Sequence, residues 1–126
     1  MSLIEDTNGK VINILGSKWT IEVVKFAKSA VLKDKDAAAI ARQYCRTITI
    51  SDGGDKKLAS PEEIDNRFKH ILRHEIVHAF LTESGLAACG AQSRTPWPKN
   101  EEMVDWIAKQ LPKISKVYEE LDILED

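Results

Sequence analysis

The pattern of hydrophobic and polar positions divides the chain into a strand-rich front, residues 1–58, and a helical back, residues 60–126. Val11–Leu15 is a mainly apolar run, and Gly16–Lys18 follows it as a turn. Trp19–Val24 alternates in part between apolar and polar residues. This pattern predicts two strands that pair as a hairpin.

Two further segments of the front half precede the first strong helical signal. Residues 33–43 are rich in alanine, which favours a short helix, although the stretch has no firm amphipathic pattern. Arg46–Ile50 alternates polar and β-branched residues, which predicts a half-buried strand. The alternation places Ile48 and Ile50 on the core face, with Thr47 and Thr49 opposite.

The strongest pattern predicts a long helix over about residues 61–83. Ser60-Pro61-Glu62-Glu63 is a capping box with proline at the first helical position, and Gly85 is placed to end the helix. Val77 and Leu81 lie outside the apolar arc, so we expect the helix to be buried between layers, with Arg46–Ile50 beside it. The arc itself consists of Ile64, Phe68, Ile71, Leu72, Ile76, Ala79 and Phe80.

The remainder of the chain predicts a connection, residues 86–99, and then two amphipathic helices. Asn100 can cap the first of these helices, and Pro112 is expected to end or kink it. The acidic end, residues 119–126, is typical of a solvated tail. The apolar stripes are Met103, Val104, Ile107 and Leu111 in the first helix, and Ile114, Val117, Leu121 and Leu124 in the second.

Length and composition indicate an ordinary globular protein. The 126 residues suffice for a single domain, 1–126, and 43% hydrophobic with 30% charged residues is an average balance. A net charge of −2 argues against a nucleic-acid partner. No run of apolar residues is long enough for a membrane span, and residues 1–10 lack the apolar core of a secretory signal. We therefore expect a cytoplasmic protein with no membrane partner.

The chemistry of the chain concentrates in His74-Glu75-Ile76-Val77-His78 on the predicted long helix. Histidines four residues apart differ by only about 40° around a helix axis, so both imidazoles can reach one ion. Zinc accepts neutral imidazole nitrogen at about 2.0–2.1 Å. Glu75 points about 100° away from His74, which suits a carboxylate that holds a metal-bound water and takes its proton. His70 continues the same series and is expected to stay outside the site.

A third protein ligand is required, since two histidines hold zinc weakly. No histidine follows His78, and the candidates are Glu83, Glu101, Glu102 and Asp105. Residues 100–105 fit the pattern NExxxD, in which the glutamate binds the metal and the aspartate orients a ligand histidine. That register favours Glu101 over Glu102, which is followed at the same spacing by Trp106. Cys45 and Cys89 show no CxxC spacing and are expected to be reduced, half-buried thiols, with a place near the metal conceivable for Cys89.

With HExxH and then NExxxD on a second helix, residues 60–111 resemble the gluzincin group of zinc peptidases. HEIVHAFLTESGL followed by EEMVDWIA looks most like short phage or prophage zincin-like proteins, and is similar to the peptidase domain of the ImmA/IrrE group. The resemblance implies an α+β fold, with a small twisted sheet on the active-site helix and an edge strand that holds an extended peptide. It implies that His74, His78 and Glu101 bind zinc, that Glu75 is the base, and that Asp105 orients a ligand.

The function expected from these features is zinc-dependent hydrolysis of peptide bonds in a cytoplasmic protein or peptide substrate. The resemblance assigns no residue to the stabilisation of the oxyanion; Tyr44 and Tyr118 are the two tyrosines of the chain. The alternative is a zincin-fold binding or assembly module, of phage or prophage origin, in which zinc serves structure only.

Overall fold

The computed structural model describes residues 2–85 and 101–126, apart from the side chains at 101, 102, 104, 105 and 108. These residues form, in chain order, α1 (Leu3–Thr7), β1 (Val11–Ile14), β2 (Ser17–Val24), the 3-10 helix η1 (Phe26–Lys28), α2 (Ala30–Lys35), β3 (Ala39–Arg42), β4 (Thr47–Ser51), α3 (Pro61–Glu83) and α5 (Glu101–Glu120). The α1 helix has no counterpart among the predicted elements.

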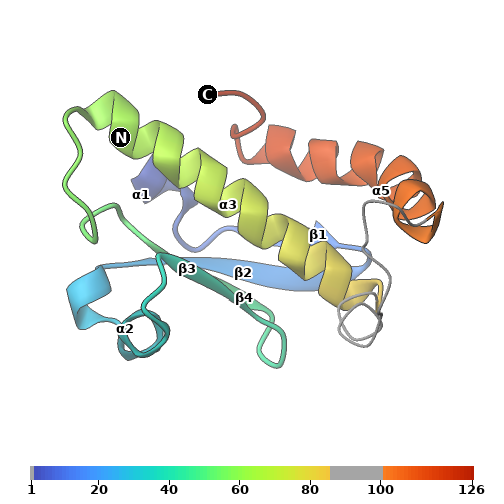
Figure 1. Ribbon diagram of the computed structural model, residues 1–126, viewed down its shortest axis with the longest axis horizontal. Coiled ribbons are helices and arrows are strands. Elements are labelled where there is room, and N and C mark those ends of the chain that lie inside the picture. The colour runs from blue at the N-terminus through green and yellow to red at the C-terminus, as the bar shows by residue number, and fades with distance from the viewer. Residues whose placement is uncertain (1, 86–100) are drawn as a thin grey trace.

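The strands form a mixed four-stranded sheet in the order β1-β2-β4-β3, and the α+β class is as predicted. The long helix α3 crosses one face of the sheet, α5 lies on the same side, and α2 lies on the other side (Figure 1). The core between α3 and the sheet includes Trp19, Ile21, Leu72 and Ile76, all fully buried. In the described part of the chain, no helix has the length and apolar character needed to cross a bilayer.

The predicted hairpin is confirmed, because β1 and β2 pair antiparallel. Its turn is Leu15-Gly16 rather than Gly16–Lys18, and Ser17 already belongs to β2. Both turn residues have positive φ, 53° and 94°, and this left-handed pair matches the twist of a two-residue hairpin. The Asn13 side chain accepts a hydrogen bond of 2.7 Å from the Gly16 N–H, which supports the turn.

The strand predicted at Arg46–Ile50 is confirmed as β4, with Ile48 and Ile50 buried in the core and the strand packed against α3. Residues 33–43, ambiguous in sequence with alanine favouring a short helix, divide between two elements, since the helix α2 ends at Lys35 and the later part is the edge strand β3. Pairing with β4 and packing on α3 override the helical propensity of alanine here. Thr49, predicted opposite the core, is also buried, because α2 contacts β4 on that face.

Helix α3 has the predicted bounds and caps. Ser60 accepts a hydrogen bond from the Glu63 N–H, and the Glu63 carboxylate accepts one from the Ala59 N–H, one residue before the position that a capping box uses. Gly85, with φ of 84°, follows the end of the helix. The apolar arc faces the core as predicted, although Ile64 and Ile71 are only half-buried.

The two helices predicted after residue 100 form one continuous helix, α5, with Pro112 inside it. Figure 1 shows the orange first part of α5 running in a different direction from the red second part, as expected where proline removes a backbone hydrogen bond. In the predicted first stripe, Ile107 and Leu111 are 41% and 54% exposed, Met103 is half-buried, and the side chain of Val104 lies outside the described residues. Ile107 and Leu111 line an apolar groove with Val77 of α3. In the second stripe Ile114, Val117 and Leu121 are buried, and Leu124 is exposed.

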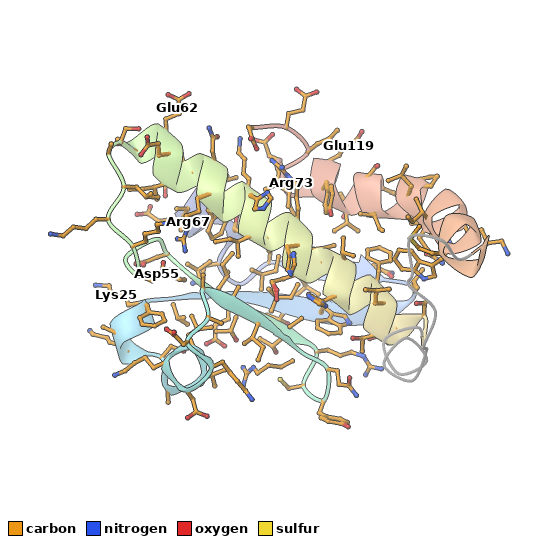
Figure 2. All side chains as sticks on the ribbon, in the orientation of Figure 1. Lys25, Asp55, Glu62, Arg67, Arg73 and Glu119 are labelled. Carbon is orange, nitrogen blue, oxygen red and sulfur yellow. The ribbon has the colours of Figure 1, made fainter. Side chains whose placement is uncertain are left out.

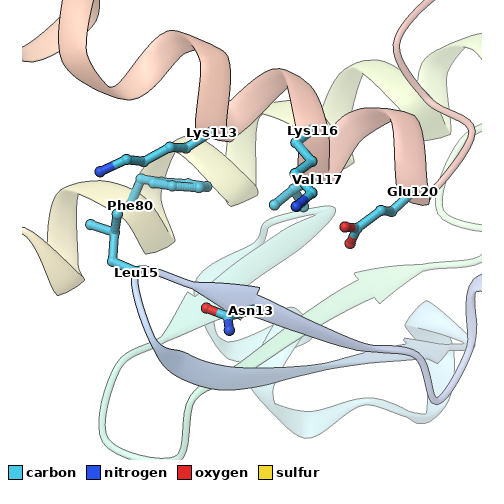
Figure 3. Close-up of a pocket in the computed structure, with 7 residues that line it drawn as sticks. All are labelled: Asn13, Leu15, Phe80, Lys113, Lys116, Val117 and Glu120. Carbon is cyan, nitrogen blue, oxygen red and sulfur yellow. The ribbon is translucent and has the colours of Figure 1, made fainter.

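The second half of α5 packs over the hairpin formed by β1 and β2. Phe80 of α3 is 1% exposed and lies between Lys113 of α5 and Leu15 of the turn (Figure 3). The Tyr118 hydroxyl donates a hydrogen bond of 2.9 Å to the Arg73 carbonyl of α3. These contacts place α5 against the side of α3 that faces away from β3.

Glu83 joins the end of α3 to the sheet, and its removal is expected to destabilise the fold. One carboxylate oxygen accepts hydrogen bonds of 2.7 Å from the buried Trp19 indole and from Arg46. Loss of this acceptor leaves the indole N–H unpaired, at about 1–3 kcal/mol. The helix dipole opposes a carboxylate at this end by only about 0.3–1 kcal/mol, so the hydrogen bonds dominate.

Denaturant unfolding measures the effect of removing Glu83. Glu83→Ala should lower the free energy of unfolding by this amount, Glu83→Gln should lower it less, and the exposed control Glu119→Gln should leave it unchanged. Equal stabilities would contradict the assignment.

Asp55 anchors the loop before α3 and should make stability depend on pH. Both of its oxygens accept hydrogen bonds from Arg67, at 3.1 and 2.7 Å, and Figure 2 shows the two side chains together beside the first half of α3. The Arg67 hydrogen bonds hold the pKa of Asp55 below its ordinary value, with a smaller contribution from Ser51.

A carboxyl with a lowered folded pKa contributes stability above its unfolded pKa, about 3.9, and loses that contribution as the pH falls through the folded value. Asp55→Asn should therefore lower the free energy of unfolding by about 1–3 kcal/mol at neutral pH. The difference from the wild type should shrink as the pH falls below about 4. Thermal unfolding from pH 7 to pH 2, beside the exposed α2 variant Asp34→Asn, tests this. A difference that stays constant down to pH 2 would reject the linkage.

Candidate metal centre

The α3 helix brings His74 and His78 together on its exposed face. Their Nε2 atoms lie 3.1 Å apart, and the ring centroids are 4.8 Å apart with the rings edge to face at 69°. Both imidazoles are exposed, so a cation can reach them from solvent. The i, i+4 spacing on a regular helix permits this geometry.

The separation of the two nitrogens fits a shared metal ion. Two nitrogen ligands at about 2.0–2.1 Å from one tetrahedral zinc ion lie about 3.3 Å from each other. His74, Glu75 and His78 each contribute one donor atom, and these atoms all lie within 4.8 Å of one another. Imidazole nitrogen and carboxylate oxygen are both donors that zinc accepts. The three residues therefore form a group that can hold a metal ion.

Glu75 differs from the histidines because it is buried, with 6% of its surface exposed. Burial raises the pKa of the Glu75 carboxyl; His78, His74 and a hydrogen bond from the Ala41 backbone each oppose this rise. The carboxyl therefore lies between the histidine pair and the edge strand β3. A glutamate that accepts protons more readily than usual is suited to proton transfer.

Ala41 is not among the predicted site residues, because the pattern of residues 33–43 is ambiguous and their alanine content favours a short helix. The packing of Ala39 and Ala41 against the core turns this face of β3 toward α3. The signal that could have identified the strand is the short separation between Ala39–Arg42 and the predicted strand that follows it, which is typical of a hairpin.

Other residues considered for the site lie at the start of α5 and, for His70, on α3. α5 begins at Glu101, but the side chains of Glu101, Glu102 and Asp105 lie outside the described residues. Their roles stay predictions. His70 is exposed and is not part of the three-residue group, as expected.

Among the described residues, Cys45 and the two tyrosines add no donor to this group. Cys45 is a free thiol, exposed rather than half-buried, and Cys89 lies outside the described residues. Tyr44 is 98% exposed in the turn between β3 and β4. The Tyr118 hydroxyl is bound to the Arg73 carbonyl, so neither tyrosine is positioned as an oxyanion donor.

No protein-family model, curated protein or solved structure matches the chain. The assignment of a metal centre therefore depends on the geometry of His74, Glu75 and His78.

Proposed function

We propose that the protein is a zinc-dependent peptidase that hydrolyses peptide bonds in cytoplasmic protein substrates. The observation that supports this most is the combination of two exposed imidazoles, with Nε2 atoms 3.1 Å apart, and a buried carboxyl beside them. A purely structural zinc site has no need of a buried base next to an accessible ion, whereas hydrolysis requires both.

The residues divide the chemistry between binding and proton transfer. His74 and His78 hold the ion through Nε2, and Glu101 is proposed as the third ligand. Zinc, when bound, supplies a Lewis acid that acidifies water and polarises the substrate carbonyl. Glu75 takes the proton of the attacking water and delivers it to the leaving amine. Burial beneath the histidines keeps the Glu75 carboxyl from rotating into bulk solvent.

The position of β3 supports an extended peptide as the substrate. β3 is an edge strand of the described sheet, paired only with β4, and Ala41 lies beside Glu75. A peptide that adds to this edge by backbone hydrogen bonds would carry its carbonyl groups past the carboxyl. Main-chain recognition of this kind suits an unfolded or extended segment of a protein.

A contact between α5 and the end of α3 supports the proposal that α5 supplies the third ligand. The Trp106 indole donates a hydrogen bond of 3.0 Å to the Ser84 hydroxyl, next to the end of α3. Ser84 is six residues, or about 9 Å of helix rise, beyond His78. This contact brings the second turn of α5 to the end of α3 that follows the histidine pair, as a third ligand from α5 requires.

Glu101→Gln is expected to weaken zinc retention sharply, and Glu102→Gln is not. Adjacent residues point about 100° apart on a helix, so only one of the two carboxylates can face the metal. Competition with a chromophoric chelator measures both variants in parallel. The reverse ranking would overturn the NExxxD register, and with it the orienting role of Asp105.

A non-catalytic binding or assembly module is the competing function, favoured by the absence of a positioned tyrosine donor among the described residues. The two are separated by measuring the zinc content of untagged protein and its cleavage of unfolded protein substrates, with and without chelator. Chelator-sensitive cleavage supports the peptidase. Stoichiometric zinc without turnover supports the module.

A further inference from the structure

The face of the sheet away from α3 carries a pocket of about 470 Å³, between the strands and the segment of η1 and α2. Three basic side chains line it, Lys25, Lys28 and Arg42, against one acidic side chain, Glu22. Lys25 is labelled in Figure 2, on the side of the sheet occupied by α2. This excess of positive charge favours an anionic ligand.

A buried hydroxyl without a partner distinguishes this pocket from a solvated polar face. Thr49 lines the pocket and is 2% exposed, and its hydroxyl has no hydrogen-bond partner among the described residues. The Nε of Arg42 is also buried without a partner in this part of the chain. Leaving such groups unpaired costs about 1–3 kcal/mol each, so a ligand that pairs them gains affinity.

The strand register places Thr49 and Arg42 on the same face of the sheet. Thr49 of β4 is paired with Glu22 of β2 on one side and with Ile40 of β3 on the other. The Arg42–Glu22 ion pair, at 4.0 Å, therefore spans β4 close to Thr49. This long ion pair is weak, and a stronger anion can displace Glu22 from Arg42.

From these contacts we propose that the pocket binds a small phosphate monoester. Phosphate carries a charge of about −1.5 to −2 and three acceptor oxygens, which match the three basic side chains and the Thr49 hydroxyl. Val24, Ala30 and Val31 supply an apolar wall for the organic part of the molecule. The site is independent of the proposed peptidase activity, since Ala41 and Arg42 point to opposite faces of β3.

The test is an NMR titration of the metal-free chain of 126 residues with phenyl phosphate and with inorganic phosphate. Saturable shifts are expected at the amides of residues 25–29, Arg42 and Thr49, with phenyl phosphate binding more tightly. Absence of saturable shifts would overturn the proposal. Equal affinity for phenyl phosphate and inorganic phosphate would contradict a monoester as the ligand, because the organic group would then contribute nothing to binding.

Thr49→Val is the decisive variant, because it removes the hydroxyl, preserves the shape and leaves no unpaired group behind. It should weaken binding by about tenfold without lowering thermal stability, the loss expected for one hydrogen bond to a charged group. Thr20→Val, which removes an exposed hydroxyl from the same sheet face, should have no effect. If the exposed lysines alone attract the anion, Thr49→Val and Thr20→Val will bind phosphate with equal affinity. That result would refute the site.

Two further variants locate the ligand. Glu22→Gln should tighten binding, since it removes the anion that competes for Arg42. His74→Ala should bind phosphate like the wild type. Loss of binding in His74→Ala would place the anion at the histidine pair and reject the pocket.

Discussion

Replacing Glu75 with glutamine is expected to lower the rate of peptide hydrolysis by about 10²–10⁴-fold while zinc content stays unchanged. The amide has nearly the shape of the carboxyl but cannot take a proton from water at neutral pH. Glu75 is 6% exposed and lies against the Ala41 backbone, so the substitution removes one chemical property and keeps the packing.

The readouts are the initial rate of cleavage of an unfolded protein, zinc per chain, and the thermal midpoint. Glu62→Gln, in the exposed first turn of the same helix, is the matched control and should keep full activity. Equal turnover of Glu75→Gln and the wild type would remove Glu75 as the base. Loss of zinc in Glu75→Gln would instead make Glu75 a ligand.

Alanine at His74 or at His78 is expected to weaken zinc binding severely. Loss of a residue that only orients a ligand lowers metal affinity by roughly 10–100-fold, and loss of a ligand should lower it further. Each substitution removes one of the two nitrogens that lie 3.1 Å apart, so the remaining imidazole loses its partner in this pair. Both side chains are exposed, so neither change should unfold α3.

His70→Ala is the matched control, because His70 is exposed on the same helix and lies one turn before His74. Its zinc affinity should equal that of the wild type in competition with a chelator. If His70→Ala loses as much zinc as His74→Ala, histidine content rather than the paired geometry would explain binding. If both His74→Ala and His78→Ala keep stoichiometric zinc, the site lies elsewhere.

Local signals predicted the parts of the fold that depend on neighbouring residues. The capping box at Ser60 and the glycine at 85 determine both ends of α3, and the period of 3.6 determines its buried face. The histidine pair depends on the same regularity, since a helix places residues 74 and 78 on one face.

The parts that depend on distant residues were predicted less well. Residues 39–42 form a strand because β4 offers a partner, which alanine content does not indicate. α5 continues through Pro112, and its buried positions are determined by α3 and the hairpin rather than by the first apolar stripe. For the same reason the sequence indicated the histidine pair but not the approach of Ala41 to Glu75.

The most direct test of the metal centre is zinc K-edge X-ray absorption on untagged protein loaded with one equivalent of zinc. The expected spectrum shows only nitrogen and oxygen neighbours at about 2.0–2.1 Å, with the multiple scattering of two imidazoles. A sulfur neighbour at about 2.3 Å, or a spectrum without imidazole scattering, would contradict zinc binding by His74 and His78.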